Sequence, residues 1–182
     1  MIRYGIGAAA ILAASLSHGQ SFFLDGDSPG TGSLLGTTPL VTAFGTVSFA
    51  GEFRDDPSDP DLIAAGASGN VFDIDNSTSM ASFSFDFDVQ SFEFIFGGND
   101  GVFEIRAFDI GGNLVDSFTQ PDTDAGAFAG PFTLSGAGIR TVTWEDPGFS
   151  FAPIDNVTVT IPAPATAALI GAAGLAASRR RR

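Results

Sequence analysis

The sequence predicts an all-β fold: an antiparallel β-sandwich of the jelly-roll type, with a signal helix before it and a short membrane-directed helix after it. Three observations support this prediction. Phenylalanine occurs 19 times and recurs at every second position in several stretches, which is the periodicity of a strand. Turn-forming Gly and Asn residues separate these stretches. The chain begins and ends with short apolar segments, each accompanied by arginine.

Residues 1–19 are predicted to be a signal peptide. Arg3 supplies the positive start, and an apolar stretch follows it. Ser17 and Gly19 then place small residues at positions −3 and −1 relative to a signal-peptidase cut before Gln20. The competing interpretation is a buried first helix. Because a polar, Gly-rich stretch follows at once and the apolar run is too short for a permanent anchor, export is the prediction.

The middle of the chain, residues 20–161, is predicted to be one domain of about nine short strands. In the three clearest strands Phe alternates with Ser, Asp or Glu, at 83–89, 92–96 and 103–108. Hairpin turns are expected at 97–101 and 111–113. Further strands are predicted at 46–51, 70–74, 114–119, 131–134, 139–145 and 157–161. Each strand would bury one face, and Phe rings from two sheets would interdigitate in the core.

Composition restricts the chemistry available to this domain. The chain has no cysteine and no lysine, and its one histidine, His18, lies in the predicted signal peptide. Ser-His-Asp and Cys-His hydrolases, lysine Schiff-base enzymes and histidine-ligated transition metals are thereby excluded. Three arginines and 21 acidic residues give residues 20–161 a formal net charge of −18, which disfavours a nucleic-acid partner.

A cluster of carboxylates after Arg54 is the candidate metal site. The hard oxygen ligands that Ca²⁺ prefers are supplied here by Asp55, Asp56, Asp59 and Asp61. Their spacing is not that of an EF-hand, and a calcium cage needs about six to eight converging oxygens. A solvated acidic loop is therefore the favoured interpretation, with Ca²⁺ as the only cofactor considered. Shorter acidic pairs occur at 73–76 and 122–124.

The glutamates and the tryptophan are the remaining site candidates. A carboxylate-based glycosidase needs two carboxyl groups on either side of the bond to be cut. Glu93 and Glu104 are expected on neighbouring strands, on the solvent face near Arg106, where cross-strand ion pairing explains them better than catalysis. No catalytic residue is assigned. Trp144 is taken as a core residue, although alternation alone leaves its direction open.

The last 21 residues have the organisation of a membrane-directed tag. Pro162 and Pro164 end the last strand, since proline cannot donate to a ladder. Residues 165–178 carry no charge and, as a helix, would extend about 21 Å, which is short for a bilayer core of about 30 Å. The arginine cluster that would stop transfer on the cytoplasmic side consists of Arg179, Arg180, Arg181 and Arg182.

This ending resembles the PEP-CTERM sorting signal of exopolysaccharide-producing Gram-negative-type bacteria, which combines a Pro-Glu-Pro motif, a transmembrane-like helix and an arginine cluster. Pro162 and Pro164 match the two prolines, and Ala163 stands where the family has glutamate. The resemblance implies recognition and cleavage by an exosortase, a membrane cysteine protease, on the way to the cell surface or matrix. Residues 152–159 also resemble the last strand of the β-sandwich domains that often precede this tag, which are usually not enzymatic.

The sequence therefore predicts a signal peptide at 1–19, a β-sandwich domain at 20–161 and a sorting tag at 162–182. The expected function is that of an exported, non-enzymatic protein of the cell envelope, surface or extracellular matrix, structural or adhesive in exopolysaccharide. Its expected partners are the secretion translocon, an exosortase-like protease, the membrane before processing and extracellular polysaccharide. The alternatives are a carbohydrate-binding module and a carboxylate-based glycoside hydrolase. No ligand-binding residue is predicted for either.

Overall fold

The computed structural model describes residues 19–24, 26, 37–55, 63–64, 66–74, 78–97, 102–120, 130–145 and 152–163. Within the chain, Ser21–Thr160 forms one compact unit. Residues 1–18 of the predicted signal peptide, Pro164, the apolar segment 165–178 and the terminal arginines lie outside the described residues. No helix among the described residues is both long enough and apolar enough to cross a membrane.

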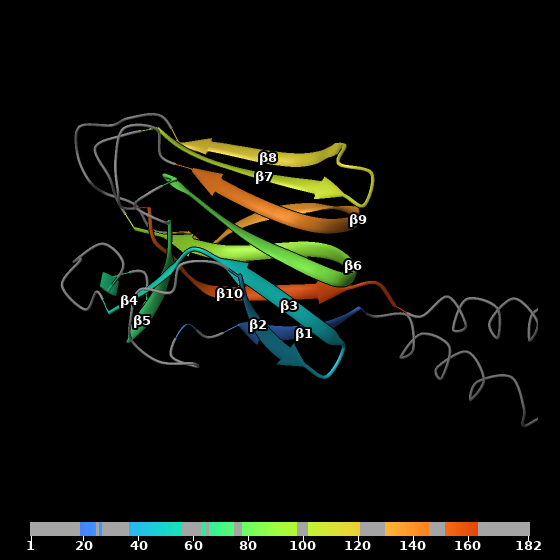
Figure 1. Cartoon of the computed structure of the whole chain (residues 1–182), viewed down its shortest axis with the longest axis horizontal. Coiled ribbons are helices and arrows are strands. Elements are labelled where there is room, and N and C mark those ends of the chain that lie inside the picture. Colours follow the sequence, from blue (N-terminus) through green and yellow to red (C-terminus); the bar gives the residue numbers. More distant parts are fainter. Residues whose placement is uncertain are drawn as a thin grey trace, which may run out of the picture. The chain divides into compact units, whose positions relative to one another are not determined.

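Apart from a short helical piece at residues 63–64, the regular elements of the described structure are strands (Figure 1). They are β1 (Gln20–Leu24), β2 (Thr37–Thr42), β3 (Gly45–Ala50), β4 (Glu52–Asp55), β5 (Asn70–Asp73), β6 (Met80–Phe96), β7 (Phe103–Asp109), β8 (Leu114–Gln120), β9 (Phe132–Glu145) and β10 (Ile154–Ile161). The pairings among β2 to β10 are antiparallel. The all-β antiparallel class is thus confirmed, while β1, β2 and β4 are strands that the sequence analysis did not predict.

The strands follow the order β4-β5-β10-β6-β9-β7-β8 in one hydrogen-bonded sheet. In addition, β1 pairs with β10, and the β2–β3 hairpin pairs with β6 through β3. The long strand β6 therefore has different neighbours along its length. Its first half lies beside β3, and its second half lies beside β10.

The two longest strands, β6 and β9, bend at the same end of the sheet (Figure 1). Their pairing shifts register on both sides of the pair Val89↔Ile139, and such bulges bend strands. On β9 the bend includes Gly138, whose φ of 75° favours glycine. Arg140 Nε donates to Asp88 Oδ1 at 2.8 Å and so links the two bends.

These bends explain how the prediction and the structure differ. The sequence pattern divides β6 into 83–89 and 92–96, and β9 into 131–134 and 139–145. The structure joins each pair of segments into one strand across a bulge. Within the all-β class, the sequence predicts a jelly-roll sandwich of two separate sheets. The hydrogen bonds instead connect all ten strands into a single curled sheet whose two halves face each other across the core.

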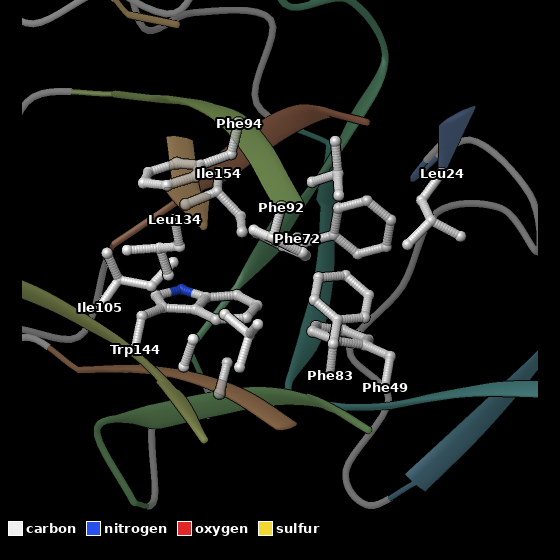
Figure 2. Close-up of a cluster of buried hydrophobic side chains, with 14 of the residues drawn as sticks. Leu24, Phe49, Phe72, Phe83, Phe92, Phe94, Ile105, Leu134, Trp144 and Ile154 are labelled. Carbon is white, nitrogen blue, oxygen red and sulfur yellow. The ribbon is translucent and has the colours of Figure 1, made fainter. Parts of the chain in front are cut away.

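Phenylalanine is the most frequent residue in the core between these halves, where its rings pack with aliphatic side chains and Trp144 (Figure 2). Phe72 of β5 lies 5.1 Å from Phe49 of β3 and 4.9 Å from Phe83 of β6, measured between ring centroids. Trp144 of β9 is fully buried, and its indole Nε1 donates to the Ala152 carbonyl oxygen at 2.9 Å. The predictions that alternating Phe residues fill the core and that Trp144 belongs to it are confirmed.

Candidate binding surface

Side chains that point away from the core form a polar outer face over β3, β6, β9 and β7. Because neighbouring residues of a strand point to opposite faces, the buried Phe83 and Val142 alternate with residues of this outer face. Four residues that are at least partly exposed lie in register across the strands: Ser48, Ser84, Thr141 and Phe108. The result is a row of hydroxyl groups that ends at an aromatic ring.

Part of this row lines a shallow depression of about 410 Å³, called here the outer depression. Its lining combines hydroxyl groups, one arginine, one carboxylate and apolar side chains, and it includes Ser84, Phe108, Asp109, Ile110, Arg140 and Thr141. Ligand sites commonly pair apolar walls with a few polar groups that fix orientation. The outer depression is therefore the candidate binding surface of the described structure.

Asp109, at the end of β7, holds the turn that borders the outer depression. Its Oδ1 accepts hydrogen bonds from the backbone N–H groups of Gly111 at 2.8 Å and Asn113 at 2.9 Å. Its Oδ2 accepts a further bond from Asn113 Nδ2 at 2.9 Å. The side-chain bond from Asn113 is the main reason why the pKa of Asp109 is lowered. The predicted turn at 111–113 is confirmed, and it leaves Ile110 exposed at the rim.

A charged group on β4 and β5, called here the inner triad, consists of Glu52, Arg54 and Asp73. Glu52 and Asp73 lie opposite each other in register, and both are buried. Arg54 Nη2 is 3.1 Å from Glu52 Oε2, and Arg54 Nε is 3.1 Å from Asp73 Oδ2. Asp73 Oδ1 accepts hydrogen bonds from the backbone N–H groups of Ile74 at 2.7 Å and Ala152 at 2.8 Å.

Burial raises the pKa of Asp73 to about 6, although the backbone hydrogen bonds and Arg54 act in the opposite direction. Its Oδ2 contacts Arg54 as an ion pair, but no donor in the described structure is aligned for a hydrogen bond to it. Because the guanidinium occupies the place between the two carboxylates, the inner triad is a structural ion-pair group. Over the described ranges, no group of three or more acidic or histidine side chains is suited to hold a metal ion.

A matching group on β7 and β9, called here the outer triad, consists of Glu104, Arg106 and Glu145. Arg106 Nε donates to Glu104 Oε1 at 2.8 Å, and Arg106 Nη2 also pairs with Glu104 Oε2. Arg106 Nη1 donates to Glu145 Oε1 at 2.8 Å. The hydrogen bond to Glu104 is the main reason why the pKa of Arg106 is raised.

The outer triad corrects one prediction about the glutamates. Glu93 and Glu104 were expected on neighbouring strands, but β9 lies between β6 and β7. Glu93 is in register with Thr133 and Thr158 instead, and Glu104 is in register with Glu145. Cross-strand ion pairing is confirmed between Arg106 of β7 and Glu145 of β9, while Glu104 pairs with Arg106 within β7.

The predicted calcium ligands lie at the edge of the described structure. Asp55 is the last residue of β4, where its backbone pairs with Asn70. Asp56, Asp59 and Asp61 lie outside the described residues, so the calcium site stays a prediction. Arg54, which precedes this cluster, belongs to a strand and not to a loop.

The predicted sorting motif begins directly after the sheet. β10 ends at Ile161, and the described residues continue through Pro162 and Ala163 without a strand. Pro164 lies outside the described residues. The end of the last strand at the first proline is the position that the sequence analysis predicts.

The outer depression and the inner triad are features that the sequence analysis missed. The run Asp109-Ile110-Gly111-Gly112-Asn113 was recognised as a turn, but the role of Asp109 in holding it was not. The depression itself depends on register across three strands, which no local pattern contains.

Comparisons with known proteins give no family for this chain. No protein-family model matches it, and no curated protein matches it. Among solved structures, it is similar to an exo-beta-1,3-galactanase from Phanerochaete chrysosporium determined with galactose, at 14% identity. The match covers 79% of this chain and 29% of the galactanase chain, with a TM-score of 0.28. The chain spans less than a third of that enzyme, and a match of this quality carries no conclusion about activity.

Proposed function

We propose that the protein is an exported, non-enzymatic component of the cell surface or extracellular matrix. It is sorted through its PEP-CTERM-like tag and acts as a structural or adhesive protein in exopolysaccharide. The secretion translocon and an exosortase-like protease are its transient partners.

The observation that carries this proposal is where the folded unit begins and ends. β1 starts at Gln20, the first residue after the predicted signal cleavage, and β10 stops at Ile161, directly before Pro162. The buried hydrophobic residues of the described structure run from Leu24 to Val159. Removal of both flanking segments would therefore leave this core intact, as processing at both ends requires.

The outer depression supports a contact with carbohydrate, which is the binding-module form of the proposal. Ser84 and Thr141 offer hydroxyl groups, and Arg140 offers a guanidinium group held by Asp88. The ring of Phe108 lies beside them. Hydrogen-bonding groups next to an aromatic ring suit a sugar, which has polar hydroxyls and apolar C–H faces.

The outer triad gives less support to the hydrolase alternative. Glu104 and Glu145 lie side by side as a hydrolase pair would, but Arg106 binds both carboxylates. A glycosidase needs substrate or water between its two carboxyl groups. Arg106 fills that position, so these carboxylates are explained by ion pairing.

The sorting part of the proposal is tested by the intact mass of protein recovered from the surface of producing cells. The expected mass corresponds to a chain that begins near Gln20 and ends before the apolar segment 165–178. A variant with glutamine in place of the four terminal arginines is the control, and it should keep its tag. Recovery of wild-type protein with residues 165–182 still attached would contradict the sorting claim.

The carbohydrate part is tested by binding to exopolysaccharide from the producing cells. Arg140→Gln should weaken binding, whereas Arg106→Gln, also on the outer face but outside the depression, should not. Thermal unfolding of both variants shows whether they stay folded, and Thr141→Val provides a second change in the depression. Equal binding by all variants would remove the outer depression as the site.

A further inference from the structure

Both ends of the folded unit leave the sheet side by side. β1 pairs with β10, and Ser21 Oγ lies 2.9 Å from Thr160 Oγ1, a hydrogen bond between residues far apart in sequence. Thr160 is in register with Ser91, which adjoins the bend of β6. The predicted signal peptide and the predicted tag are therefore attached at the same end of the domain, next to that bend.

Apolar side chains gather at this end, which we call the exit pole; its residues are Phe22, Phe23, Val41, Phe44 and Phe87. The Phe22 ring lies 5.4 Å from Phe44 and 5.9 Å from Phe87, measured between centroids. These contacts bring β1, the β2–β3 turn and the bend of β6 together. Phe23 and Val41 are 54% and 87% exposed, which are large fractions for apolar side chains.

Two of the strand segments at the exit pole, β1 and the β2–β3 hairpin, are uncharged, whereas β6 carries the exposed Asp86 and Asp88 on either side of Phe87. β1 contains no charged residue, and none occurs from Ser28 to Gly51, a segment that includes β2 and β3. Residues 20–161 as a whole carry 21 acidic residues and three arginines. An anionic membrane surface repels acidic protein surface, so β1 and the β2–β3 hairpin can approach it more closely than the bend of β6, where Asp88 pairs with Arg140.

The tag leaves little distance between this pole and a membrane. Between Thr160 and the apolar segment 165–178 lie only residues 161–164. The five residue steps from Thr160 to Ala165 span at most about 18 Å in fully extended conformation. If the apolar segment enters a bilayer, Thr160 is held close to the lipid surface, and the exit pole with it.

We infer that the exit pole contacts the lipid surface until the tag is removed. The inference rests on the proposed sorting function, because it needs the tag in the membrane. Phe23 and Val41 would enter the headgroup region. Cleavage of the tag would then free the domain, since so few apolar side chains bind a membrane only weakly.

Single-cysteine labelling tests the inference directly, since the full chain contains no cysteine. Val41→Cys and Ala43→Cys place an environment-sensitive fluorophore at the exit pole, where both residues are exposed. Val102→Cys is the matched control: it is also an exposed valine, but it precedes β7 at the opposite end. The seven residues of β7 put it about 20 Å from the bends. The full-length variants are reconstituted into phosphatidylcholine vesicles, with and without phosphatidylglycerol.

The expected result is blue-shifted emission and protection from iodide quenching at positions 41 and 43, with neither effect at 102. Flotation of the vesicles separates two kinds of failure. If the chain floats with the vesicles but positions 41 and 43 remain as accessible to iodide as 102, the exit pole does not face the membrane and only this inference is overturned. If the chain does not float with the vesicles, the tag is not membrane-directed, and the sorting proposal fails together with the inference.

Discussion

The inner and outer triads have the same local design in two different environments. In each, a glutamate and an arginine two residues later lie on one strand, as Glu52 with Arg54 and Glu104 with Arg106. In each, the third carboxylate comes from the neighbouring strand, in register with that glutamate. The inner carboxylates are buried, whereas the side chains of Glu104 and Glu145 are 30% and 27% exposed.

This difference shows that a charge pattern along a strand does not determine what the charges contribute. Water screens the outer triad, so its ion pairs should contribute little to stability. Asp73 in the inner triad has lost its hydration, and Arg54 and two backbone N–H groups replace it only in part. Removal of a partner should therefore have unequal consequences in the two groups.

The largest effect is expected for Arg54→Met. The substitution keeps much of the side-chain volume but leaves Glu52 and Asp73 buried without their cation. The free energy of unfolding at pH 7.5 should fall by roughly 3–5 kcal/mol, as when one partner of a buried ion pair is removed. Urea denaturation measures this value. The same substitution at Arg106 is the matched control, and equal losses at the two sites would refute the distinction between the triads.

The next effect concerns pH and Asp73. Its pKa of about 6 in the folded state exceeds the ordinary value of 3.8, so the folded protein keeps a proton that the unfolded chain has released. The contribution of this group to stability is complete below pH 3.8 and is lost as the pH rises through about 6. The loss amounts to about 3 kcal/mol at a rate of 1.4 kcal/mol per pKa unit.

Asp73→Asn should abolish this part of the pH dependence. Urea denaturation between pH 4 and pH 8 compares the wild-type protein, Asp73→Asn and the control Glu145→Gln. The decrease in stability across pH 4–6 should be smaller in Asp73→Asn than in the other two proteins. If the free energy of unfolding changes equally with pH in all three proteins, the carboxyl group of Asp73 does not titrate with a raised pKa.

The two triads also mark how far the sequence could predict this structure. Alternation of Phe with polar residues predicted the stretches 83–89, 92–96 and 103–108, because the period of two is a local property. β4 was missed because its four residues, Glu52–Asp55, are too few to show a period and adjoin an acidic cluster. The burial of Glu52 beside Arg54 was consequently unpredictable.

Long-range pairing is the other limit on prediction. The outward direction of Glu104 and its bond to Arg106 followed from alternation, but Glu145 became their partner only because β9 lies between β6 and β7. The curl of the sheet and the outer depression depend on the bulges around Val89 and Gly138. Bulges require a partner strand to define them, so the sequence showed each bent strand as two separate ones.

A small effect is expected for Arg106→Met. The outer triad is solvated, so the free energy of unfolding at low salt should fall by less than about 1 kcal/mol. In 1 M NaCl the Debye length is only about 3 Å, and most of this loss should disappear. Arg54→Met should remain strongly destabilising under the same conditions. A loss at Arg106 that is insensitive to salt would show that its aliphatic stem, and not its charge, is responsible.

The smallest expected effect is a difference between the coupling energies of Arg106 to the two carboxylates of the outer triad. Arg106 contacts Glu104 through two nitrogen atoms and Glu145 through one. Paired contacts of this kind are stronger than single ones, so the coupling of Arg106 to Glu104 should exceed its coupling to Glu145 by a few tenths of a kcal/mol. Double-mutant cycles with Arg106→Met, Glu104→Gln and Glu145→Gln measure the two couplings. A larger coupling to Glu145 would mean that cross-strand pairing outweighs the paired contact within β7. The outer triad would then contribute mainly by joining β7 to β9.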